Sequence, residues 1–188
     1  MKRLDQLVTI RSGYTFRGAI DSFPTGSIEV VQAKDLGPDY SFASRPKIDF
    51  PGEDKHLLHP GDVLVSARGF AKAVLFQDKD EKVVASSSIF VLSPKSEQVN
   101  MEFITMFFNS IPGIKAVLEL SSGAAIKSIT KDSLGSIMIP SIEPSKERAL
   151  GKAIQAIDDE LALMSEKEIY LGHIRESIIS KTLKEAAK

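Results

Sequence analysis

A short loop within the segment GDVLVSARGFAKAVLF carries three side chains that could contact an anionic or aromatic ligand. Two apolar runs, Val63–Ala67 and Ala73–Phe76, flank the residues Arg68, Phe70 and Lys72. Apolar, β-rich runs around a glycine-containing loop of this length predict a β-hairpin. Because hairpin tips are usually small and polar, two cations and an aromatic ring predict a tip that touches a binding partner.

The chain carries none of the catalytic signatures that would make it an enzyme by itself. The nucleotide-binding patterns G-x-x-x-x-G-K-[ST] and G-x-G-x-x-G are absent, and so is the nucleophile elbow G-x-S-x-G. His56 and His59 frame the run HLLH, which lacks the glutamate of a zinc-protease helix, and His173 stands apart. With no cysteine there is also no thiolate metal site. We therefore expect no catalytic residue and no metal.

One pattern keeps a stand-alone PD-(D/E)xK-like nuclease open as an alternative. Pro38-Asp39 followed by Glu53-Asp54-Lys55 spells the PD…ExK order of many metal-dependent nucleases. That chemistry needs the carboxylates and the lysine on adjoining strands that converge on Mg²⁺. Here both pieces lie in turns rich in proline and glycine, where charged residues are ordinary solvent-facing choices.

Composition restricts the class of protein. The chain has 188 residues, 43% of them hydrophobic, and a formal net charge of −1. No stretch approaches the 18 consecutive apolar residues of a membrane span, and the absence of cysteine is typical of a reducing compartment. We expect a cytoplasmic protein without a membrane segment. The neutral total argues mildly against a free-standing nucleic-acid binder, although it can contain a basic face.

Residues 1–142 are expected to form one domain made of short elements. Strand-like segments alternate with proline- and glycine-rich turns; they are Ile28–Leu36, Gly61–Ala67, Ala73–Phe76, Val83–Leu92 and Gly135–Pro140. The three serines at Ser86–Ser88 are read as small polar side chains inside a strand. A helix is predicted over Asn100–Ser110 with Asn100 as its cap, and a second helix after Pro112. The sum is a globular α/β domain of the mixed α+β type.

Residues 143–188 are expected to form one long helix that begins at Ser145 as N-cap, because no proline follows Pro144. Apolar residues recur there at heptad spacing, with a shift of phase around Glu168 and one glycine, Gly172, inside. The seam consists of Leu150, Ile154, Ile157, Leu161, Met164, Leu171, Ile174 and Ile178. Such a helix is longer than the preceding domain can cover, so we expect a coiled coil with another helix.

Taken in order, seven segments resemble the DNA-specificity subunit of type I restriction–modification systems. They are LDQLVTIRSGYTFRG, IEVVQAKDL, LLHPGDVLVSARG, SSSIFVLSP, EFITMFFNS, SSGAAIKSITKDSLGSIMIP and PSKERALGKAIQAIDDELA. The helix entry departs from the family's usual Glu-Gln, because Glu147-Arg148 stands there. The usual subunit has two such halves in tandem, and this sequence corresponds to one half, with one target-recognition domain.

The resemblance implies a non-catalytic subunit that binds double-stranded DNA and directs partner subunits to an interrupted, palindromic target. Modification (methyltransferase) subunits and restriction subunits are the implied partners, and S-adenosylmethionine, ATP and Mg²⁺ are expected only in them. The implied DNA-binding residues are Arg11, Tyr14, Arg17, Lys34, Arg68, Lys72, Lys127 and Lys131. A single domain reads few base pairs, so we expect a homodimer through antiparallel C-terminal helices.

A different class of function also remains open at this point. The chain could be a coiled-coil adaptor, or a regulator that sequesters restriction–modification subunits. A regulator that mimics DNA should expose many Asp and Glu side chains, whereas the predicted loop tips here carry Arg and Lys. The basic tips therefore favour DNA as the ligand.

Overall fold

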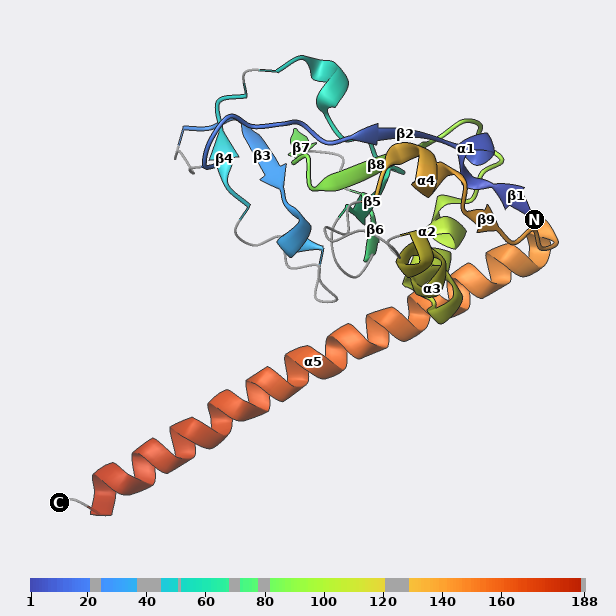
Figure 1. Cartoon of the computed structure of the whole chain (residues 1–188). Coiled ribbons are helices and arrows are strands. Elements are labelled where there is room, and N and C mark those ends of the chain that lie inside the picture. The colour runs from blue at the N-terminus through green and yellow to red at the C-terminus, as the bar shows by residue number, and fades with distance from the viewer. Residues whose placement is uncertain are drawn as a thin grey trace. The chain divides into compact units, whose positions relative to one another are not determined.

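The computed structural model describes residues 1–20, 25–36, 45–50, 52–67, 72–77, 82–120 and 129–186. The chain divides into two compact units, Met1–Glu147 and Arg148–Lys188. The first unit is a mixed α/β domain, as predicted, and the second is almost entirely one long helix. Figure 1 shows the helices and strands of the chain.

A four-stranded antiparallel sheet forms the centre of the first unit, with strands in the order β2-β8-β5-β6 (Figure 1). These strands are β2 (Val8–Ser12), β8 (Ile89–Pro94), β5 (Val63–Ser66) and β6 (Ala73–Leu75). β5 and β6 pair in the register Val63↔Leu75 and Val65↔Ala73, which confirms the predicted hairpin. β2 was not predicted, because its sequence VTIRS is only half apolar.

A second sheet contains β4 (Lys47–Ile48), β3 (Ile28–Val31) and β7 (Val83–Ala85), in that order. β3 runs antiparallel to β4 and parallel to β7. The predicted strand Ile28–Leu36 is shorter than expected, since a 3-10 turn, η1 (Ala33–Asp35), follows β3. In η1 the Asp35 carboxylate accepts a hydrogen bond from the Gln32 backbone N–H at 2.8 Å, which ends the strand.

The prediction of one strand over Val83–Leu92 was wrong. The segment contains β7 and β8, which belong to different sheets, and a turn at residues 86–88 separates them. The Ile89 N–H donates to the Ser86 carbonyl at 2.9 Å and closes this turn. Serine hydroxyls compete for backbone hydrogen bonds and so favour turns. The serines therefore break the apolar run instead of lying inside a strand.

The two ends of the first unit meet in a small sheet. β1 (Lys2–Arg3) pairs antiparallel with β9 (Met138–Ile139), which is shorter than the strand predicted there. Between them lie two short helices, α1 (Leu4–Leu7) and α4 (Lys131–Gly135). The Leu4 N–H donates to the Ile137 carbonyl at 2.9 Å, so α1 is tied to the segment that leaves α4.

Two consecutive helices, α2 (Met101–Asn109) and α3 (Ile111–Leu120), pack on the first sheet. The predicted cap is confirmed, because the Phe103 N–H donates to the Asn100 side chain at 3.0 Å. Apolar side chains of α2, notably Phe103, Ile104 and Phe108, are buried in the same cluster as Val65 and Leu92 of the sheet. Among the described residues no single helix could span a bilayer by length and apolarity, and only the bent pair α2–α3, at 75°, passes that test jointly.

The long helix α5 (Pro144–Ala186) has 43 residues and continues without interruption through Gly172. At 1.5 Å per residue it is roughly 65 Å long. Its predicted cap was wrong: Pro144, not Ser145, opens the helix, and the Ser145 N–H donates to the Glu143 carboxylate at 2.9 Å. Proline is favoured at the first helical position because its missing N–H has no partner there anyway.

Candidate nucleic-acid interface

The turn at residues 86–88 lies where the four-stranded and the three-stranded sheet of the first unit meet. From the β2 side, the Gly13 N–H donates to the Ile89 carbonyl at 2.9 Å. The Tyr14 N–H donates to the Ala85 carbonyl at 2.7 Å, and Tyr14 forms an isolated parallel β-bridge with Ser86. The segment that carries Arg11, Tyr14 and Arg17 is therefore fixed against this turn.

The other two basic segments reach the same turn. From β3, the Val31 carbonyl accepts a hydrogen bond from the Ser86 N–H at 2.8 Å, and η1 with Lys34 follows directly. From the hairpin, the Ala67 N–H donates to the Ser88 carbonyl at 2.8 Å. Three segments that are far apart in the sequence thus converge on one turn.

The strand register shows how these segments are spaced. Ser12 pairs with Phe90, Phe90 with Val65, and Val65 with Ala73, so the four residues form one row across the sheet. Lys72 precedes Ala73 at one end of the row, and Gly13 follows Ser12 at the other end. With strands about 4.8 Å apart, the row is roughly 14 Å wide. A surface of that width can contact one groove of a DNA duplex and its flanking phosphates.

Three of the predicted cations on these segments are available for a ligand. Arg17, Lys34 and Lys72 are exposed. Within the described part of the chain none of the three forms an ion pair. Ser87, on the turn at residues 86–88, is also exposed. Sequence reasoning did not select Ser87, although the serine run at residues 86–88 was a visible signal. Two other predicted residues, Arg68 and Lys127, lie outside the described residues.

Arg11 has a structural task at this site. Its guanidinium donates to the Leu57 carbonyl at 2.8 Å and to the His56 carbonyl at 3.2 Å, and it lies 3.4 Å from the Asp62 carboxylate. The side chain is 24% exposed. These contacts tie β2 to the segment that enters the hairpin. Any contact of Arg11 with DNA remains a prediction and would have to be made by the remaining exposed part of the guanidinium.

A buried carboxylate, which sequence reasoning missed, fixes the base of the hairpin. Asp62 is 2% exposed. Its side chain accepts hydrogen bonds from the Ser93 hydroxyl at 2.6 Å and from the His59 N–H at 3.0 Å. Its backbone carbonyl accepts a bond from the Phe76 N–H at 2.8 Å. Asp62 follows a Pro-Gly turn, and nothing in the neighbouring sequence indicates that it is buried.

Tyr14 belongs to a half-buried group of aromatic rings. Its ring centroid lies 4.9 Å from those of Phe16 and Phe50 and 5.2 Å from that of His56, each time edge to face. His56 is the last residue of a 3-10 turn, η2 (Asp54–His56). Edge-to-face contacts of this kind fix the orientation of the rings. Sequence reasoning selected Tyr14 but not two of its partners, because Phe50 and His56 are distant in the chain.

Lys131 lies away from the other predicted cations. It opens α4 and lines a shallow concavity of about 430 Å³ together with Asp5, Val8, Thr9 and Lys95. Because Val8 pairs with Pro94 and Ser12 with Phe90, this concavity lies at the opposite end of β2 from Lys72. Among the described residues, the predicted cation Lys131 is therefore separate from the segments that contact the turn at residues 86–88.

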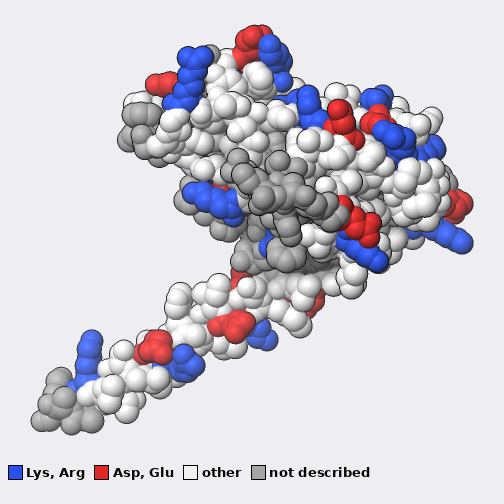
Figure 2. Space-filling view, viewed as in Figure 1, with Lys and Arg blue, Asp and Glu red and all other residues white. Residues whose placement is uncertain are grey.

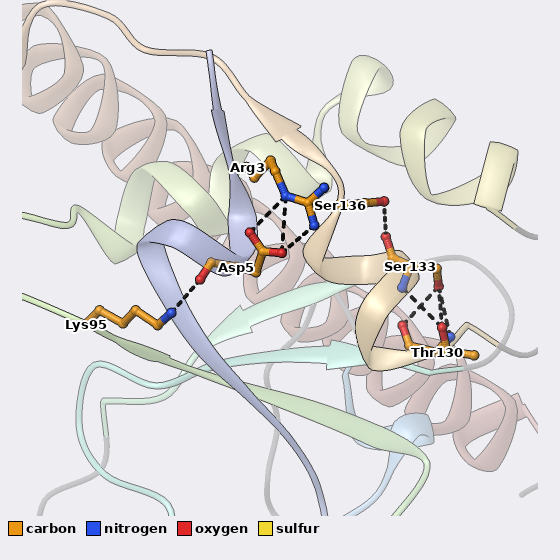
Figure 3. A network of polar contacts seen from close by, with 6 residues as sticks. All are labelled: Arg3, Asp5, Lys95, Thr130, Ser133 and Ser136. Atoms are coloured by element: carbon orange, nitrogen blue, oxygen red, sulfur yellow. Dashed lines mark hydrogen bonds and ion pairs between the residues drawn. The ribbon is translucent and has the colours of Figure 1, made fainter.

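Figure 3 shows the polar network beside this concavity. The Arg3 guanidinium donates to the Asp5 carboxylate at 3.1 Å, and Lys95 donates to the Asp5 carbonyl. Hydrogen bonding by Arg3 lowers the pKa of Asp5, and the same contact raises the pKa of Arg3. Thr130 caps α4 through a reciprocal pair of hydrogen bonds with Ser133. Most of these polar groups bond one another, which indicates that they stabilise this end of the domain.

Charge on the visible face of the domain is mixed, with Lys and Arg side chains interspersed with Asp and Glu (Figure 2). Part of the positive charge is paired: Glu29 lies 3.0 Å from Arg45 and 3.5 Å from Lys47. Glu53 lies 3.0 Å from Lys55, on exposed η2. Pro38 and Asp39, the other half of the nuclease pattern, lie outside the described residues. Within the described ranges no group of three or more His, Asp or Glu side chains could hold a metal ion.

The long helix α5 exposes apolar side chains along its length. Of the predicted seam, Leu150, Ile157, Leu161, Met164, Leu171, Ile174 and Ile178 are exposed within the described structure, and Ile154 is half-buried. Further exposed apolar residues, which the heptad analysis missed, lie from the middle of the helix onward: Leu163, Ile169, Tyr170, Ile179 and Leu183. At about 100° per residue, Tyr170 and Leu183 point about 140° apart. The second half of α5 therefore presents more than one apolar face.

Comparison with known families gives one match, and it covers most of the chain. The model described as "Type I restriction modification DNA specificity domain" matches residues 1–171. A search of curated protein sequences found no significant match.

Solved structures with the same fold include two specificity (HsdS) subunits. For that of Thermoanaerobacter tengcongensis the TM-score is 0.60 at 19% identity, over 86% of this chain and 38% of the other. For that of M. genitalium the TM-score is 0.58 at 16% identity, over 88% and 40%. A third chain, from a structure that addresses complex assembly and conformational transition of the type I R-M system, gives 0.64 at 21% identity, over 95% and 44%. This chain thus spans less than half the length of these three.

Proposed function

Because the chain belongs to the type I restriction–modification DNA specificity family, we propose that it is a non-catalytic subunit that recognises double-stranded DNA. The observation that carries this proposal is the convergence of three segments on the turn at residues 86–88. Arg17, Lys34 and Lys72 lie close in sequence to these contacts, as exposed cations without an ion pair among the described residues. Lysine and arginine contact phosphates, and arginine can also read guanine in the major groove.

The partners that we propose are methyltransferase and restriction subunits, which would supply S-adenosylmethionine, ATP and Mg²⁺ chemistry. The exposed apolar side chains of α5 support such contacts, because an isolated helix of this length gains its stability from packing against neighbours. In the first half of α5 the exposed seam residues Leu150, Ile157 and Leu161 fall on one face. In the second half, Ile169 and Tyr170 add further apolar surface, which leaves room for a second neighbour.

We further propose that one of these neighbours is a second copy of the chain, packed antiparallel along α5. One recognition domain reads too few base pairs to select a site in a genome. Two copies related by a twofold axis would double the recognised sequence and impose a palindromic target with an unread spacer.

Methylation mapping tests the function directly. The chain is expressed in cells together with a type I methyltransferase subunit, and methylated adenines are located by sequencing. We expect an interrupted palindromic motif that disappears when the chain is omitted. Methylation that is independent of the chain would overturn the proposal and would favour a regulator or adaptor instead.

A matched pair of variants tests the surface. The first variant replaces Arg17, Lys34 and Lys72 by glutamine, and it should lose motif methylation. The control removes the same number of exposed charges elsewhere in the domain; its substitutions are Lys2→Gln, Lys82→Gln and Lys115→Gln. The control should keep wild-type methylation. Equal loss in both variants would show that total charge, rather than this surface, matters.

A further inference from the structure

Asn109, the last residue of α2, holds the first residue of β6 with both ends of its side-chain amide. The Ala73 N–H donates to Asn109 Oδ1 at 2.9 Å, and Asn109 Nδ2 donates to the Ala73 carbonyl at 2.8 Å. Two hydrogen bonds between one amide and one residue reproduce the pattern that a neighbouring β-strand would make. They restrain both the position and the orientation of Ala73.

These bonds complete an edge of the central sheet. β6 is the last strand in the order β2-β8-β5-β6 and pairs only with β5. Toward β5, the Lys72 carbonyl accepts a hydrogen bond from the Ser66 N–H at 3.2 Å, whereas the groups of Ala73 point away from β5 to Asn109. Ala73 is 1% exposed. Without Asn109, its N–H and carbonyl would lack partners in a nearly buried position, which is unfavourable.

The core holds Asn109 in place. Phe103, Phe107 and Phe108 of the same helix are buried in the main hydrophobic cluster, which also contains Ala73. Asn109 itself is exposed, so its apolar packing contributes little and its amide is what links the two elements. A chain of fixed contacts therefore runs from the core through Asn109 and Ala73 to Lys72, where the hairpin tip begins.

We propose that Asn109 is a positioning residue that holds Lys72 for contact with DNA. This inference rests on the proposed function, because it takes Lys72 to face DNA. A side chain in a binding site must be held to within about 0.5 Å of its productive position. The two hydrogen bonds to Ala73 restrain the backbone directly after Lys72, and the hydrogen bond from Ala67 to Ser88 restrains the end of the preceding strand.

The first test uses the free chain and needs no DNA. Hydrogen exchange at the Ala73 amide and tryptic cleavage after Lys72 are compared in the wild type, Asn109→Ala and Asn109→Asp. Loss of the amide should speed both rates on the order of tenfold. Asn109→Asp keeps an acceptor for the Ala73 N–H but loses the donor, so its exchange rate should lie between the other two. An unchanged exchange rate in Asn109→Ala would overturn the positioning role.

The matched control is Asn100→Ala, which removes the cap at the other end of the same helix. A loss of stability alone would affect exchange similarly in both variants once their unfolding midpoints are matched by temperature. Positioning predicts that only Asn109→Ala accelerates exchange at Ala73 under those conditions. Equal acceleration in the two variants would reduce Asn109 to an ordinary structural residue.

The second test links the clamp to recognition, through methylation mapping in cells that carry the chain and its methyltransferase. Asn109→Ala should lower methylation of the motif, as the loss of a phosphate contact at Lys72 would, while Asn100→Ala keeps the wild-type level. An unchanged level of methylation in Asn109→Ala would overturn the role of Asn109 in recognition. A wild-type chain that directs no methylation would instead overturn the proposed function, and the two failures are thereby distinguished.

Discussion

Gly13 lies so close to Ser86 that no side chain can stand between them. A Cβ atom added to Gly13 would lie 2.1 Å from the Ser86 carbonyl oxygen and 2.5 Å from that of Ala85. Both obstacles are backbone atoms, which cannot rotate away. This close approach lets the segment after β2 pack against the turn at residues 86–88, where the three basic segments converge.

Gly13→Ala should therefore destabilise the domain. Forcing a methyl group against backbone displaces the strand or the turn, and overpacking of this kind costs about 1–3 kcal/mol. Urea denaturation would measure the change in the free energy of unfolding. Gly172→Ala is the control, since a Cβ at Gly172 meets nothing within 4 Å. That variant should instead gain about 1 kcal/mol through helix propensity.

Asp62→Ala should be among the more damaging substitutions in the first unit. It removes the acceptor for Ser93 and His59 and leaves the Arg11 guanidinium without its carboxylate. Loss of a buried acceptor with several donors costs about 2–3 kcal/mol. Thermal unfolding would measure it. The control, Glu53→Ala, breaks an exposed ion pair and should change stability by less than about 1 kcal/mol; a loss as large as that of Asp62→Ala would contradict this account.

The contact between Arg3 and Asp5 should make stability depend on pH in the acid range. Arg3 lowers the pKa of Asp5 in the folded state, so the folded chain binds this proton less readily than the unfolded chain. The stabilisation is then fully present above the unfolded pKa of about 3.9 and is lost as the pH falls through the lowered folded value. Melting temperatures of wild type and Arg3→Gln should differ slightly at pH 7 and converge at strongly acidic pH. A difference that grows on acidification would contradict this assignment.

Local patterns in the sequence predicted the elements whose contacts are local. The β5–β6 hairpin, the Asn100 cap and the long helix all depend on residues close together in the chain, and all three are confirmed. The site depends on distant residues. Asp62 is buried because Ser93 and Arg11 reach it from other strands, and no pattern around Asp62 indicates this.

In the run Val83–Leu92, a clear local pattern led to a wrong prediction. Its apolar residues predicted one strand, but β7 and β8 join different sheets, and sheet membership is a property of the whole fold. The contacts of Tyr14 with Phe50 and His56 could not be predicted either, because these residues are distant in the chain and come together only in the folded domain. The order of the seven segments indicated the family correctly, whereas the arrangement of the site needed the structure.

Ile157→Asp should dissociate the proposed dimer. Ile157 is exposed on α5 and lies in the seam, where a buried, unpaired carboxylate would be costly. The dissociation constant should rise by more than about 100-fold, measured by sedimentation equilibrium. Ser165→Asp places the same charge outside the heptad seam and should leave association unchanged. A wild-type chain that sediments as a monomer at tens of micromolar, roughly the range of weak assemblies, would contradict the dimer.

Lys72 and Arg68 should differ in what they contribute to DNA binding. Lys72 is exposed next to β6, and a lysine there can neutralise a phosphate but carries little base information. Lys72→Ala should therefore weaken binding to all duplexes alike and reduce the slope of log K against log salt by about 1. Fluorescence anisotropy of the complex with its methyltransferase, at several salt concentrations, would measure this.

Arg68→Ala should instead change which sequences are bound. Arg68 lies outside the described residues, so this prediction follows from its place in the hairpin sequence and from the ability of arginine to bond guanine O6 and N7 together. Losing that pair should cost about 1–3 kcal/mol at one position in each half-site, with little change in the salt slope. In a twofold dimer the relaxed positions must be related by symmetry, because both half-sites meet the same residue. Methylation mapping of Arg68→Ala would show two relaxed positions placed symmetrically about the unread spacer. Relaxation on one side only would contradict the homodimer, and an unchanged motif would remove Arg68 from base reading.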